Sequence, residues 1–133
     1  MDPALFIMLG ITVTLLILVF LYMLYIIGNT LVIKWKEEPH GVAPVQAQGH
    51  FLGYYFYFRS RYEKAKIEFA RSQHDWDIDH ITKAYLLYKT NIAYKASSMS
   101  YWKAKRLIYK GCFLFLLNRI KKKIMYHKKH KNA

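Results

Sequence analysis

A run of thirty uncharged residues near the N-terminus, Ala4 to Ile33, constrains this chain more than any other feature. In a helix, roughly 20 apolar residues cross a bilayer core about 30 Å thick, so the run is long enough to span it. Asp2 can cap the first free amides and Pro3 suits the first helical turn. A cleavable secretory signal has an apolar core of about 7 to 15 residues behind a basic stretch, which does not match this run. The sequence therefore predicts a membrane-spanning helix within residues 1–35.

Charge is divided unevenly along the chain. There are 21 Lys and Arg against 8 Asp and Glu, and all eight acids lie at or before Asp79. The strongly basic part beyond Asp79 is expected to meet phospholipid headgroups, nucleic-acid phosphate or acidic protein surfaces. Lys and Arg near a span stay on the non-translocated side. This part is therefore predicted to face the mitochondrial matrix, with the N-terminus in the intermembrane space, or alternatively a bacterial cytoplasm.

Hydrophobic spacing after the span favours an all-α fold. Residues 36–53 contain prolines and glycines without a sustained period, which indicates an irregular connector. From Phe51 to Arg71, aromatic and small residues recur at steps of three and four, which is typical of a helix. The spacing resumes after Asp77, a possible cap, and favours one long helix or two nearly coaxial ones, although the serine-rich residues 97–100 could cap a separate helix. The prediction is an antiparallel helical hairpin over residues 51–127 with a long second arm.

The far half of the long second arm has no counterpart within the chain. Contiguous apolar surface on an unpaired helix normally marks an interface. The residues predicted to form a protein interface are Trp102, Leu107, Ile108, Tyr109, Phe113, Leu116 and Ile120. We therefore expect the protein to be incomplete alone and to need other subunits of a membrane complex.

A polybasic tail, residues 119–133, forms the end of the chain. Basic residues near a membrane each contribute on the order of 1 kcal/mol towards an anionic leaflet, for example one that contains cardiolipin. The candidate lipid or anion contacts are Lys34, Trp35, Lys36, Arg119, Lys121, Lys122, Lys123, Lys128 and Lys129. The same cations would bind nucleic-acid phosphate, with Tyr126 as a stacking face, and a merely solvated tail is the alternative.

Catalytic, metal and cofactor motifs are weak in this sequence. Asp75, Asp77 and Asp79 alternate as at the start of a calcium loop, but the glycine and glutamate that such a loop requires are missing. Cys112 lies among apolar residues, where a cysteine is usually inert packing. We therefore predict no catalytic residues, no metal and no cofactor, and no enzymatic activity.

The layout as a whole, a short basic aromatic-rich chain with one N-terminal span and no catalytic motif, resembles a known class. It is similar to the single-span accessory subunits of mitochondrial respiratory-chain complexes and ATP synthases. The resemblance implies a non-catalytic structural subunit of the mitochondrial inner membrane that stabilises its neighbours. The alternative is a membrane tether whose basic tail binds RNA, a ribosome or anionic lipid.

Overall fold

The structure is a computed structural model that describes residues 2–131; residue 1 and residues 132–133, the end of the predicted tail, lie outside this range. The chain divides into two units, one ending at Val32 and one starting at Ile33. The first unit is a single helix, α1 (Pro3–Thr30). The Asp2 side chain accepts a hydrogen bond from the Ala4 backbone N at 3.0 Å, which confirms the predicted cap. By length and composition α1 could cross a membrane, and a signal sequence near an N-terminus would meet the same criterion.

The second unit is an antiparallel sheet with helices, so the prediction of an all-α fold is wrong and the fold is α+β. The five strands pair in sequence order as a meander. They are β1 (Lys34–His40), β2 (Val45–Phe51), β3 (Tyr54–Arg61), β4 (Lys64–Ala70) and β5 (Lys83–Lys89). A short helix, α2 (Gln73–Asp77), lies between β4 and β5, and a long helix, α3 (Tyr101–Lys131), follows β5.

The first arm of the predicted helical hairpin is the β3–β4 hairpin. Phe56 pairs with Phe69 and Phe58 pairs with Ile67 across these strands, and all four side chains are buried. Aromatic and β-branched residues favour a pleated surface, where alternate residues face opposite sides. Because β3 carries aromatic residues on both of its faces, its period of two is masked, and residues taken from both faces mimic helical spacing.

The predicted connector, residues 36–53, is also wrong, because it forms most of β1 and all of β2. Pro39 lies in β1, an edge strand, where a missing backbone donor is tolerated. Gly49 lies inside β2, where an added Cβ would stand 2.5 Å from the Lys34 carbonyl oxygen. Both residues suggested a loop. In the structure, Pro39 occupies an edge strand, and Gly49 allows the backbones of β1 and β2 to approach closely.

The long helix predicted from Asp77 is replaced by a short helix, a strand and a separate helix. The Ser72 hydroxyl caps α2 by accepting from the Asp75 backbone N at 3.1 Å, and Asp77 ends this helix instead of starting one. The α3 helix starts at Tyr101, and the Ser100 hydroxyl accepts from the Lys103 backbone N at 3.2 Å. The alternative of a separate helix capped within residues 97–100 is therefore the correct one.

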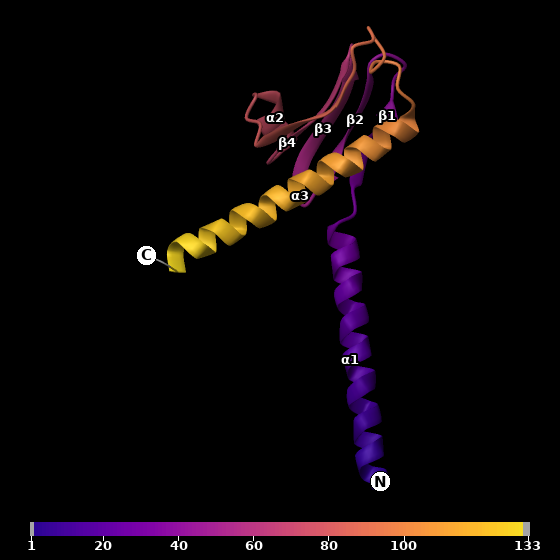
Figure 1. The fold of residues 1–133 in the computed structure, drawn as a ribbon, viewed down its shortest axis with the longest axis vertical. Helices are drawn as coiled ribbons and strands as arrows, with labels where there is room; N and C mark the ends of the chain where they lie inside the picture. The colour runs from indigo at the N-terminus through magenta and orange to yellow at the C-terminus, as the bar shows by residue number, and fades with distance from the viewer. Residues whose placement is uncertain (1, 132–133) are drawn as a thin grey trace. The chain divides into compact units, whose positions relative to one another are not determined.

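The core lies between one face of the sheet and the N-terminal half of α3. The buried residues of α3 are Ala104, Ile108, Gly111, Cys112 and Phe115. The rings of Phe115 and Phe69 stack with centroids 4.2 Å apart, and a Cβ on Gly111 would meet Ile67 Cγ2 at 2.6 Å. The absent side chain lets α3 approach the sheet closely. Figure 1 shows that α3 crosses the sheet and that its C-terminal end continues past it.

Candidate protein and membrane interface

The outward face of α3 carries a row of exposed apolar side chains, here called the α3 stripe. Its members follow one another at helical steps of seven, four, four, three and four residues. They are Trp102, Tyr109, Phe113, Leu117, Ile120 and Ile124. Their exposed fractions run from 46% at Leu117 to 73% at Trp102. Because the opposite side of the same helix seals the sheet, α3 is apolar both towards the core and towards the outside.

The structure divides the predicted protein interface between this stripe and the core. Trp102, Tyr109, Phe113 and Ile120 belong to the α3 stripe, while Ile108 is fully buried against the sheet. The other two predicted residues, Leu107 and Leu116, pack partly buried at the edge of the core. Ile108 was misplaced because, without a sheet, the whole apolar surface of the helix seemed free. The predicted set also omitted Leu117 and Ile124, although both continue the helical spacing.

The predicted polybasic tail is part of α3 as far as the structure describes it. From Arg119 to Lys131 every side chain is exposed, and seven of these residues are Lys or Arg. The anion contacts predicted there, Arg119, Lys121, Lys122, Lys123, Lys128 and Lys129, are therefore presented by a helix. Nearer its start, α3 is tied to the sheet by polar contacts. The Lys105 Nζ pairs with Glu38 Oε2 at 2.7 Å.

The three anchor residues predicted next to the span lie in β1, within the second unit. Trp35 is half-buried, with its ring edge-to-face against Phe56 at a centroid distance of 5.8 Å. The Lys36 Nζ donates to Gln73 Oε1 at 2.7 Å, which joins β1 to α2. Lys34 is exposed. Trp35 therefore packs at the edge of the sheet core, and only its remaining surface could meet lipid.

Cys112, which was considered for chemistry, is buried where α3 meets the sheet. Burial raises the pKa of the Cys112 thiol to about 12, which keeps it protonated at neutral pH. Among residues 2–131, no three His, Cys, Asp or Glu side chains lie close enough together to hold a metal ion. Comparison of the chain with protein-family models, curated proteins and solved structures finds no match.

Proposed function

We propose that the protein is a non-catalytic accessory subunit of a larger membrane complex, and that its α3 stripe packs against a neighbouring subunit. The supporting observation is the stripe itself. Single exposed apolar residues are common on protein surfaces, but a contiguous row of large ones marks an interaction site. The side chains from Trp102 to Ile124 form such a row on a helix whose inner face is already occupied.

The chemistry of the partner follows from the charges beside the stripe. Arg106 and Lys110 are exposed on α3, and the whole chain beyond Asp79 has no acid. Complementary charge at the rim of an interface guides association and suppresses wrong partners. The surface that receives α3 is therefore apolar at its centre, where Phe113 docks, and carries carboxylates at its rim.

The cellular setting is supported by layout and charge. Three residues, Leu31, Val32 and Ile33, separate α1 from β1, so a membrane-embedded α1 would hold the second unit near the bilayer surface. A mitochondrial inner-membrane complex, either a respiratory-chain complex or an ATP synthase, fits a single span followed by a basic domain. By the positive-inside rule the N-terminus would lie in the intermembrane space and the second unit in the matrix.

The proposal is tested by replacing Phe113 with Glu in the full-length protein. Phe113→Glu places a carboxylate at the apolar centre of the stripe, so the protein should leave its assembly in native gels of detergent extracts. Ile92→Glu is the matched control, because both side chains are 58% exposed and Ile92 lies outside α3. An assembly that retains Phe113→Glu as well as wild type would contradict the proposal.

A tether role is the second candidate, supported by the exposed cations of residues 119–131. Binding to RNA or anionic lipid through these cations would weaken by orders of magnitude between about 50 and 200 mM salt. In the same native gels, replacing Lys121, Lys122 and Lys123 with Gln would then release the partner. Docking through the apolar stripe is expected to resist both the higher salt concentration and the three Lys→Gln substitutions. The partner is therefore released if the protein is a tether and retained if it docks through the stripe.

A further inference from the structure

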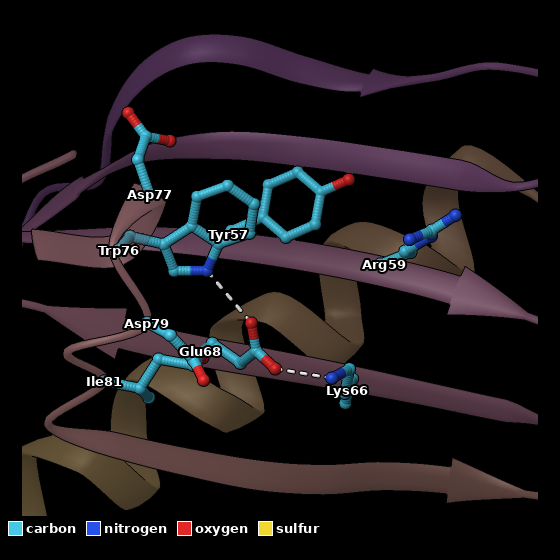
Figure 2. Close-up of a pocket in the computed structure, with 8 residues that line it drawn as sticks. All are labelled: Tyr57, Arg59, Lys66, Glu68, Trp76, Asp77, Asp79 and Ile81. Atoms are coloured by element: carbon cyan, nitrogen blue, oxygen red, sulfur yellow. Dashed lines mark hydrogen bonds and ion pairs between the residues drawn. The ribbon is translucent and has the colours of Figure 1, made fainter. Parts of the chain in front are cut away.

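Four cationic side chains gather on the face of the sheet opposite the α3 core. Arg59 and Arg61 come from β3, and Lys64 and Lys66 come from β4. The strand register places Arg59 directly opposite Lys66 and Arg61 directly opposite Lys64, and Figure 2 shows the first of these pairs on neighbouring strands. Together with Leu86 of β5 they line a hollow of about 440 Å³, here called the cationic hollow.

The positive charge of the cationic hollow is only partly neutralised. Like charges directly opposite each other across two strands destabilise a sheet. Glu68 pairs with Lys66 (Figure 2), but within residues 2–131 no carboxylate lies within 4.0 Å of Arg59, Arg61 or Lys64. Arg59, Arg61 and Lys64 therefore have no ion-pair partner within the described chain.

Arg59 shows a second sign of a missing partner. Its Nε atom is buried and has no hydrogen-bond partner among the described residues. Buried polar atoms almost always have a partner, so an exception requires an explanation. Asp77 and Asp79 line an adjoining hollow together with Arg59, but they lie at the other end of it in Figure 2. The described chain therefore provides no acceptor for the Arg59 Nε atom.

A second hollow, of about 380 Å³, adjoins the first and is here called the tyrosine hollow. Arg59 and Arg61 line both, and the tyrosine hollow adds the rings of Tyr62 and Tyr94, whose centroids are 5.7 Å apart. Tyr62 has a φ of 54°, in the left-handed region, and its backbone N donates to the Ser97 hydroxyl at 2.6 Å. Strained residues persist where the surroundings hold them, often at functional sites. The turn between β3 and β4, which lies between Arg61 and Lys64, is thus held from outside the hairpin.

We propose that the cationic hollow binds a phosphate group of an anionic ligand, and that the tyrosine hollow receives the organic part of that ligand. A guanidinium matches phosphate oxygens with two parallel hydrogen bonds, and a lysine adds a mobile point charge. The phosphate belongs either to a soluble phosphate ester or to the headgroup of an anionic phospholipid. The site lies apart from the α3 stripe, so it does not depend on the docking role proposed for that stripe.

Isothermal titration calorimetry on the full-length protein in a neutral detergent tests the site. Pyrophosphate is the soluble probe, and monomeric short-chain phosphatidylglycerol is the lipid probe. At least one should bind saturably with one ligand per chain, and Arg59→Gln should weaken that binding about tenfold or more. Arg71→Gln removes the same charge from an exposed residue just after β4 that lines neither hollow, and should leave the affinity unchanged. The probe that binds more tightly identifies the source of the phosphate.

Two results would overturn the site. One is the absence of saturable binding by both probes, and the other is an equal loss of affinity in Arg59→Gln and Arg71→Gln, which would indicate general charge attraction. Thermal unfolding without ligand separates binding from folding, since Arg59→Gln removes a like-charge pair and should not lower the melting temperature. If it does, Lys64→Gln, which alters an exposed side chain, provides the same comparison.

Discussion

Cys112 lies where α3 meets the sheet, and its surroundings determine its reactivity. Burial raises the pKa of its thiol to about 12, and only the thiolate form is nucleophilic. In native protein at about pH 8, a water-soluble thiol reagent should leave Cys112 unlabelled, whereas unfolding in urea should expose it to complete labelling. Rapid labelling of the native protein would contradict this buried position.

The same pKa shift also has a consequence for stability. The folded-state pKa of Cys112 lies above its ordinary value of 9.0, so the folded state disfavours the thiolate. The stability contributed by the neutral thiol is fully present below about pH 9 and is lost as the pH rises towards 12. Burial, together with the nearby Asp77 carboxylate, raises the pKa of Tyr55 to about 12 and adds to the loss above about pH 10. The difference in the free energy of unfolding between wild type and Cys112→Ala, measured from about pH 9 to about pH 12, gives the contribution of the thiol.

Glycines show how a single residue can mislead a prediction from sequence. Gly49 and Gly111 would each place a Cβ within 2.6 Å of a neighbouring atom, so both mark close packing between elements. The sequence alone does not reveal this packing, because the Lys34 carbonyl and the Ile67 side chain that the two glycines accommodate are distant from them in the chain.

Two segments of the α3 helix contribute differently to stability. Phe115 is fully buried and stacks on Phe69 with an interplanar angle of 6°, whereas all described residues beyond Arg119 are exposed. Phe115→Ala should lower the free energy of unfolding by about 3 to 5 kcal/mol. A chain that ends after Arg119 should change it by no more than about 0.5 kcal/mol.

Urea unfolding of the full-length protein, followed by tryptophan fluorescence, measures both effects. Trp35 packs against Phe56 and Trp76 against Tyr57, so two of the fluorophores report on the folded sheet. A truncation that destabilises the protein as much as Phe115→Ala would show that residues 120–131 belong to the folded core.

At the scale of elements, the helices could be predicted in part and the strands could not. The helix α1 is evident because an uncharged run of this length has few other structures available. The start of α3 could be read only as one of two alternatives, from the serines of residues 97–100. The strand β3 was hidden because Phe56 and Phe58 face the core while Tyr55 and Tyr57 face the other side, where the Tyr57 ring contacts Trp76.

The α3 stripe and the cationic hollow also differ in how far they could be predicted from the sequence. Trp102, Tyr109 and Phe113 could be placed together on one face of a helix, because a helical face can be read from spacing along one segment. The cationic hollow could not be predicted, because Arg59 and Lys66 become neighbours only through the register of two strands. A site built across a sheet leaves no signal at one fixed spacing in the sequence.

For the whole molecule, the role of α1 decides where the second unit works. If α1 is a membrane anchor, the full-length protein should stay in the membrane pellet after alkaline carbonate extraction. Arg at positions 16 and 18, in place of Leu16 and Leu18, should release it, since each Arg costs about 2.5 to 3.5 kcal/mol at the centre of a span. A mature protein that lacks these residues and is found in the soluble fraction would identify α1 as a signal sequence.

The meander order of the sheet has a consequence for synthesis. Each strand pairs with the strand made just before it, so the sheet can zip together from local contacts as the chain emerges from the ribosome. The α3 helix comes last and packs back onto β1 and β2, among the first strands to be made. Until it arrives, the phenylalanines of the inner face have no cover, and the nascent chain is most prone to aggregation in that interval.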